Sequence, residues 1–168
     1  MKISGLYTPD CVRTQSGVYV NVINPTPDMI VIEDIAHSLS NLCRFGGHTK
    51  DFYSVAQHSI LCADLVEGKE HKLAALLHDA SEAYLIDVPS PLKKHLPDYR
   101  KIEDNMMKVI ANKFKIKFPF DKKIKEADEK MLKTEWSILL EQDKEDFFCW
   151  SPPIANLKFM KMFRKLTK

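Results

Sequence analysis

The sequence lacks the features that would mark a secreted, membrane-spanning or strongly charged protein. None of its four cysteines forms a Cys-x-x-Cys pair, so we expect reduced, mostly buried thiols and neither a disulfide framework nor a zinc ribbon. No apolar run approaches the ~20 residues of a membrane span, and the first residues lack the apolar core of a signal peptide. The formal net charge is only +2, which argues against a nucleic-acid or membrane coat. These absences predict a cytoplasmic protein, of a bacterium or of a phage-infected cell.

Length and composition predict one globular domain. A chain of 168 residues suits a single domain with one core. Hydrophobic residues make up 45% of it and charged residues 29%, as in ordinary globular proteins. No repeat, low-complexity tract or linker divides the chain. We therefore expect residues 1–168 to form one domain, with residues 1–30 as a β-hairpin and loop appendage.

The periodicity of apolar residues changes near residue 32. Before it, residues 12–14 and 18–22 alternate around a Gln-Ser-Gly turn, which predicts a short β-hairpin. After it, helical spacing predicts helices at about 33–42, 54–66, 70–84, 91–96, 98–114, 121–142 and 154–166. Ser54 and Gln57 fit a capping box, and Asp121 can cap the long helix. The predicted fold class is all-α, a helical bundle with a short N-terminal β-hairpin.

A histidine and an aspartate stand side by side in apolar surroundings. His78 and Asp79 follow the run Leu73–Leu77, which is apolar enough to be buried. A buried imidazole beside a buried carboxylate is costly unless the two are paired or bind a metal ion. On the predicted helix at 70–84 they point about 100° apart and can flank one ion. The dipeptide alone suits a locally hydrogen-bonded pair at least as well.

Two further residues make a metal site the favoured interpretation. His58 lies in the first turn of the predicted helix at 54–66, and Asp128 lies on the stripe of its helix that should face the core. Taken singly, His58 could be a polar neighbour of the helix cap and Asp128 a buried salt-bridge partner. Together, the two imidazoles and two carboxylates of His58, His78, Asp79 and Asp128 predict a divalent-metal site with open positions. Co, Mn, Zn and Mg all remain candidates.

The order of these residues resembles the H…HD…D signature of the HD superfamily. The surrounding segments 53–59, 76–84 and 87–93 resemble the small HD-domain nucleotide phosphohydrolases, among them bacterial 5′-deoxynucleotidases and phage dATP triphosphohydrolases. The similarity spans about residues 30–140. It implies an HD-domain bundle, a deoxynucleotide substrate and a homo-oligomer, either a dimer or a hexamer.

The resemblance also assigns residues around the metal. Arg44 and Phe45 stand where the family's arginine–aromatic pair contacts substrate, although relatives often carry tryptophan in place of Phe45. Glu82 matches the family's acidic helper after the HD pair. The sugar and phosphate contacts of the family match Asp87, Val88, Pro89 and Ser90.

The residue types support some of these roles independently. On the predicted helix Glu82 shares the face of His78 and Asp79, so we expect Glu82 and Asp79 to be catalytic, with Glu82 positioning the water or shuttling a proton. Arg44 offers a planar fork for phosphate oxygens. His48 and Lys93 can add phosphate contacts, and both suit solvated side chains equally well. Glu135 lies on the same predicted helix face as Asp128. We expect it either to hydrogen-bond a metal ligand or to form a salt bridge.

The sequence thus predicts a metal-dependent phosphohydrolase that cleaves 5′-dNMP or dNTP by attack of metal-activated water at the α-phosphorus. The metal site does not distinguish mono- from triphosphates, because the same type of bond breaks. The expected partner is the small-molecule substrate, and neither a membrane nor nucleic acid. The alternatives are a cyclic-nucleotide or alarmone hydrolase and a non-catalytic nucleotide-binding module. Glu82 beside a full set of metal ligands disfavours the module, since a binder needs no activated water.

Overall fold

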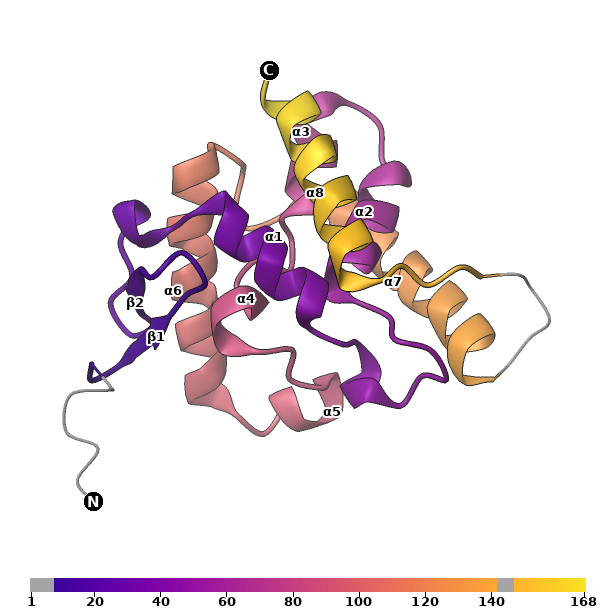
Figure 1. The fold of residues 1–168 in the computed structure, drawn as a ribbon, viewed down its shortest axis with the longest axis horizontal. Coiled ribbons are helices and arrows are strands. Elements are labelled where there is room, and N and C mark those ends of the chain that lie inside the picture. The colour runs from indigo at the N-terminus through magenta and orange to yellow at the C-terminus, as the bar shows by residue number, and fades with distance from the viewer. Residues whose placement is uncertain (1–7, 142–146) are drawn as a thin grey trace.

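A computed structural model describes residues 8–141 and 147–168 and shows a mostly helical protein with a small hairpin (Figure 1). The strands β1 (Cys11–Arg13) and β2 (Tyr19–Asn21) pair antiparallel. The helices are α1 (Ile32–Asn41), α2 (Val55–Asp64), α3 (Lys69–Leu76), α4 (Glu82–Leu85), α5 (Ser90–Lys93), α6 (Pro97–Phe114), α7 (Lys122–Glu135) and α8 (Pro152–Thr167). Two segments are short 3-10 helices, η1 (Pro27–Met29) and η2 (Phe45–Gly47). A third, η3 (Trp136–Leu140), is a π-helix. The predicted helical class and N-terminal hairpin are confirmed.

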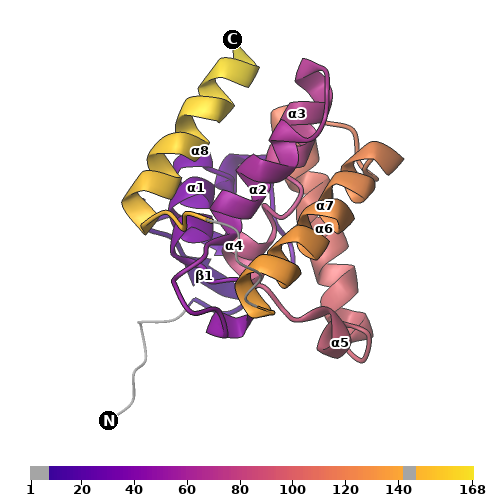
Figure 2. The same cartoon turned by 90° about the vertical axis from the view of Figure 1, so that its right-hand side faces the viewer.

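Helix α2 lies at the centre of the fold. It packs against α1, α3, α7 and α8, which surround it in the side view (Figure 2). Eight of its ten residues are buried, so it is apolar on nearly every face and carries only a weak amphipathic pattern. His58 is one of these buried residues and is fully enclosed, whereas Asp64 at the end of the helix is exposed.

Only one of the two hydrogen bonds of the expected capping box forms at the start of α2. Ser54 Oγ accepts the Gln57 backbone N–H at 3.1 Å, as a capping box requires. The Gln57 side chain instead binds the segment before α8: its Nε2 donates to the Phe148 carbonyl at 2.8 Å, and its Oε1 accepts the Trp150 N–H at 2.7 Å. The Gln57 amide thus ties the central helix to a segment about 90 residues further along.

The hairpin is joined to the helices through α1. The Ser16 backbone N–H and hydroxyl both donate to the Asp34 carboxylate, at 2.8 and 2.6 Å. Val20 on β2 is fully buried and belongs to the main core. The hairpin therefore packs on the bundle through apolar contacts, with Val18 and Val22 beside Val20, and through the two hydrogen bonds to Asp34.

Two predicted helix lengths are wrong. The helix expected at 70–84 ends at Leu76, and residues 77–81 form a turn before α4. The helix expected at 121–142 ends at Glu135 and continues as the wider π-turn of η3, while residue 142 lies outside the described residues. Neither break is marked by a glycine or proline in the sequence. The hairpin and the remaining helices agree to within a few residues.

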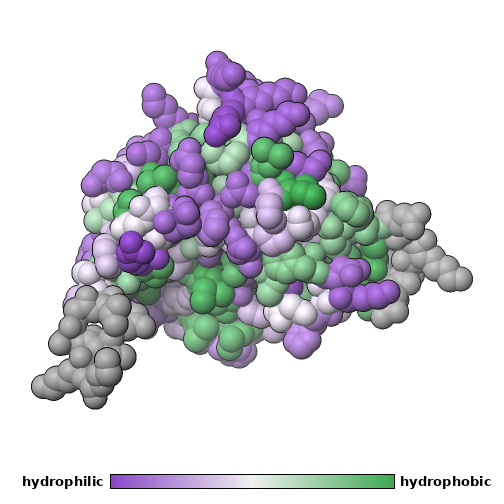
Figure 3. Space-filling view, viewed as in Figure 1, coloured by the Kyte–Doolittle hydropathy of each residue, from purple (hydrophilic) through white to green (hydrophobic). Residues whose placement is uncertain are grey.

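Exposed apolar side chains form separate patches. In the face of Figure 3, hydrophilic residues dominate, and hydrophobic ones gather at its lower centre and at its right. The most exposed large apolar side chains are Phe148, Leu157, Ile86, Leu92 and Trp136. Within residues 8–141 and 147–168, no helix is long and apolar enough to cross a membrane.

Candidate metal centre and its pocket

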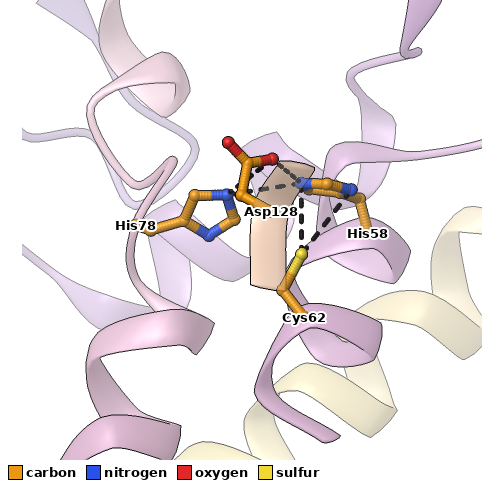
Figure 4. Close-up of side chains that lie close together, drawn as sticks. All are labelled: His58, Cys62, His78 and Asp128. Atoms are coloured by element: carbon orange, nitrogen blue, oxygen red, sulfur yellow. Dashed lines mark hydrogen bonds and ion pairs between the residues drawn. The ribbon is translucent and has the colours of Figure 1, made fainter. Parts of the chain in front are cut away.

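The structure brings all four predicted metal ligands together. His58 comes from α2, His78 and Asp79 from the turn after α3, and Asp128 from α7. His58 Nε2 lies 3.3 Å from His78 Nε2 and 3.1 Å from Asp128 Oδ1 (Figure 4). Asp79 Oδ2 lies 3.2 Å from His78 Nε2. Ligand atoms on one ion, with bonds of about 2.0–2.3 Å, are separated by about this much. The donor set and its spacing therefore fit a divalent metal ion.

The turn at 77–81 aims the His78 imidazole. His78 Nδ1–H donates to the Ala75 carbonyl at 2.7 Å, a carbonyl left without a helical partner where α3 ends. This bond makes Nδ1 the donor and aims Nε2 at the other candidate ligands. The expectation that His78, Asp79 and Glu82 share one helix face is wrong: the first two lie in the turn, and Glu82 opens α4.

Cys62 is a further donor near the centre. Its Sγ and the donor atoms of His58, His78 and Asp128 all lie within 4.8 Å of one another, so this group can hold a metal ion. The sulfur is 3.4 Å from His58 Nε2 and 3.8 Å from Nδ1 of the same ring. Nearly equal distances place the thiol against the ring and not in line with the Nε2 lone pair. Burial and the nearby carboxylates of Asp128 and Asp79 raise the pKa of Cys62.

A buried carboxylate positions His58 from behind. Glu135 Oε1 accepts His58 Nδ1–H at 2.6 Å and the Tyr53 hydroxyl at 2.6 Å. Its Oε2 accepts Nε and Nη2 of Arg44, at 3.2 and 3.0 Å. Glu135 is fully buried, so the arginine charge compensates it. A carboxylate on the outer nitrogen of a ligating histidine fixes its tautomer and orientation.

The electrostatics of the centre call for a cation. Burial works against protonation of His78, but Asp79 and Asp128 outweigh it and raise its pKa to about 9. Burial also works against ionisation of Asp128, but bonds with His58 and His78 hold its pKa well below the usual range. The proton on His78 thus balances carboxylate charge. A metal ion can replace that proton.

The metal-site residues border a pocket of about 610 Å³. This volume is typical of small-molecule sites, which span about 300–1,000 Å³. The pocket is lined by Arg44, Phe45, Gly46, His48, Asp79, Glu82, Asp87, Val88, Pro89, Ser90, Pro91, Lys93, Asp128, Leu132, Trp136 and Leu140. Every residue predicted from the sequence to contact substrate lies on this lining. His58 and His78 sit behind it, beside Asp79 and Asp128.

The residues predicted to contact substrate differ in whether their side chains are already bonded to other protein groups. Arg44 is buried and bonded to Glu135, with Nη1 3.7 Å from Asp79 Oδ2, so it is no surface cation. Lys93 Nζ donates to Glu103 at 2.7 Å, which neutralises much of its charge. His48 is exposed at the pocket rim.

Glu82 is the unpaired acid of the pocket. It is 7% exposed, and its Oε2 is buried without a hydrogen-bond partner. Burial, followed by the charges of Asp79 and Asp87, raises the pKa of Glu82 well above its usual value. Unpaired buried polar atoms are rare in folded proteins and point to a functional or ligand-dependent role. Asp87 shares the environment, since burial raises its pKa as well.

Comparison with known proteins places the chain in a family. No family model matches it. The uncharacterized protein YfdR of Escherichia coli K12 is 48% identical over 124 residues, covering 74% of this chain and 69% of the relative. The chain belongs to the YfdR family. An uncharacterized protein of Rhodobacter capsulatus is 37% identical over 129 residues, covering 69% of this chain and 66% of the relative. Neither name states an activity, so the chemistry of this YfdR-family chain is argued from its site.

Several residues that the structure places at the site have no role predicted from the sequence, among them Cys62, Tyr53 and Trp136. Cys62 follows His58 by four positions, a spacing that shares a helix face and could have revealed it. Tyr53 lies five residues before His58 with no periodic signal. Trp136 lies within the helix predicted at 121–142, and its pattern gives no sign that it lines the pocket.

Proposed function

We propose that this protein is a metal-dependent phosphohydrolase of the HD type that acts on deoxynucleotides, either 5′-dNMP or dNTP. One observation carries the proposal: the donor atoms of His58, His78, Asp79 and Asp128 converge beside a pocket that also holds an arginine and an unpaired buried acid. A structural ion pair needs no pocket, and a simple binding module needs no unpaired acid. Their combination supports hydrolysis.

The four ligand side chains would hold the ion, and Glu135 would keep His58 oriented through its outer nitrogen. When bound, a divalent ion supplies an activated water and polarises a phosphoryl oxygen. The Arg44 guanidinium also lies beside the candidate metal site, with Nη1 3.7 Å from Asp79 Oδ2. Its other nitrogens donate hydrogen bonds to Glu135. A guanidinium held on one edge presents its other edge in a defined direction, which suits phosphate oxygens.

Glu82 supplies the proton step. Its carboxyl faces the pocket without a partner, and its raised pKa keeps a proton on it at a pH where ordinary glutamates are ionised. Such a group can donate to the departing nucleoside oxygen, and once ionised it can accept a proton from water. The water oxygen bonds to the α-phosphorus as the P–O5′ bond breaks, and O5′ takes the proton from Glu82. The products are deoxynucleoside and phosphate from a monophosphate, or deoxynucleoside and triphosphate from a dNTP.

The test is turnover by the purified full chain. Panels of dNMPs, dNTPs and ribonucleotides are incubated with Mn²⁺, Co²⁺, Zn²⁺ or Mg²⁺, and products are separated by chromatography. We expect deoxynucleoside from at least one dNMP or dNTP with at least one metal. Asp79→Ala should abolish turnover, while Glu129→Gln, on the exposed face of α7, should leave it unchanged. Failure of every substrate with every metal, or an unaffected Asp79→Ala variant, would overturn the proposal.

A further inference from the structure

The pocket has two chemically different parts. Charged groups of Arg44, Asp79, Glu82 and Asp128 line the part beside the metal ligands. The remaining wall includes the apolar side chains of Phe45, Val88, Leu132, Trp136 and Leu140. A ligand that fills both parts carries a charged end and an apolar, flat or bulky end. A nucleotide has this division, between its phosphate and its base.

Two aromatic rings form a surface in the apolar wall. Phe45 and Trp136 meet edge to face, with ring centroids 6.2 Å apart and planes at 74°. Trp136 is 51% exposed, although it borders a pocket and belongs to a helical segment. Its exposed indole face is therefore accessible to a ligand that fills the pocket.

Both rings are held in place by their surroundings. The Trp136 Nε1–H donates to Glu141 Oε1 at 3.1 Å. The Arg44 guanidinium carbon lies 5.4 Å from the centroid of the Phe45 ring. The ring positions are therefore fixed on one side, by a carboxylate and a cation, before any ligand enters.

The backbone at both rings is unusual. Phe45 has φ of 53°, a left-handed conformation that strains a residue with a bulky side chain. Trp136 opens the π-helix η3, and π-turns inside helices occur frequently at functional sites. Irregular backbone persists where surrounding structure enforces it, and it clusters at ligand sites.

We infer that the nucleobase of the substrate stacks on the indole of Trp136, which Phe45 contacts edge to face. The inference rests on the proposed function, because it takes the ligand to be a nucleotide whose phosphate lies beside the metal ligands. It adds a specificity residue from η3 that the sequence did not assign. Every base has a flat π-face, so an aromatic surface accepts all of them.

The same geometry limits base discrimination. The indole N–H of Trp136 is already bonded to Glu141, and the neighbouring wall residues Leu132 and Leu140 offer no polar side-chain atom. This part of the wall therefore recognises stacking area and not the hydrogen-bonding edge of a base. We expect purines to bind more tightly than pyrimidines, with both classes accepted.

The chain contains only two tryptophans, so fluorescence can report on one of them. In a Trp150→Phe background, the full chain loaded with Zn²⁺ is titrated with deoxyadenosine, deoxycytidine, 2-deoxyribose and inorganic phosphate. None of these probes can be hydrolysed at a phosphate ester. We expect deoxyadenosine to change Trp136 emission and to bind at least about tenfold more tightly than 2-deoxyribose, as base stacking predicts.

Substitutions test the surface directly by calorimetry. Trp136→Leu should weaken deoxyadenosine binding by about tenfold and leave inorganic phosphate binding unchanged. Trp150→Leu is the matched control, because that ring packs under Lys158 and does not line the pocket. Equal binding of deoxyadenosine and 2-deoxyribose, or a Trp136→Leu variant that binds deoxyadenosine normally, would overturn the inference.

These outcomes separate the inference from the proposed function. Turnover of nucleotides without any dependence of base binding on Trp136 rejects the stacking surface alone. Stacking of deoxyadenosine on Trp136 without turnover of any nucleotide rejects the hydrolase and keeps the base-binding surface.

Discussion

At the residue scale, Glu135 links the candidate metal ligand His58 to Arg44 and Tyr53. All four side chains are buried, in a region where an unpaired charge is expensive. The network therefore serves both stability and ligand orientation. Its geometry allows the two contributions to be separated by mutation.

Glu135→Gln should lower metal affinity by about 10- to 100-fold, the range seen when a partner of a ligating histidine is removed. It should also reduce the free energy of unfolding by about 3–5 kcal/mol, because Arg44 loses its buried counter-charge. Tyr53→Phe is the control: it removes one donor to the same carboxylate and keeps the bond to His58. Calorimetric titration and urea unfolding give the two quantities. Equal metal affinity in both variants would contradict a positioning role for Glu135.

Cys62 presents a second question at this scale, since its sulfur is close enough to be considered a ligand. Because it packs against the His58 ring, we expect the Co²⁺-loaded protein to lack the near-ultraviolet charge-transfer band of a cobalt–thiolate bond. Cys62→Ala should then bind Co²⁺ with unchanged affinity. A strong band that disappears in Cys62→Ala, but persists in Cys43→Ala, would instead make the sulfur a ligand.

At the element scale, the N-terminal hairpin is a separate unit held by few contacts. Asp34 at the start of α1 is 3% exposed and accepts two hydrogen bonds from Ser16. Hydrogen bonds to a charged group are stronger than neutral ones. The pair therefore fixes where the hairpin docks.

Asp34→Ala should reduce the free energy of unfolding by about 2–3 kcal/mol, because both bonds to the carboxylate disappear and the Ser16 donors lose their acceptor. Glu33→Ala, at the exposed neighbouring position, should change it by no more than about 0.5 kcal/mol. Urea denaturation followed by circular dichroism measures both. Similar effects of the two substitutions would show that the hairpin contact contributes little.

At the scale of the whole molecule, the metal ligands connect three parts of the bundle: α2, the turn after α3, and α7. A ligand that binds only the folded state stabilises it by mass action. Occupancy of this centre should therefore be visible in global unfolding as well as in activity.

Addition of Co²⁺ at about 100 times its Kd should stabilise the protein by about 2.7 kcal/mol. For a chain of this size that raises Tm by roughly 5–10 °C relative to EDTA. Asp128→Asn should remove most of the increase, whereas Glu129→Gln, one residue further and exposed, should retain it. Scanning calorimetry measures the shift. An unchanged Tm in EDTA and in saturating Co²⁺ would contradict a metal centre in this bundle.

The sequence by itself determined the helical class and the hairpin, and it predicted four metal ligands whose donor atoms the structure brings together. Apolar periodicity and turn residues are local signals. His58, His78 and Asp79 stand out as polar groups in apolar segments, whereas Asp128 lies in a charged segment and its side chain is 42% exposed. It also indicated Arg44 and Glu82, through the resemblance to a family of similar motif order.

Only the tertiary structure decided how these residues act. The break after Leu76 comes from the His78 imidazole bonding to the Ala75 carbonyl, which no local pattern announces. The Glu135 network joins residues more than 70 positions apart, and the Trp136 ring reaches the pocket through a π-turn. Such contacts depend on how helices pack, and packing is a property of the whole chain and not of any short segment.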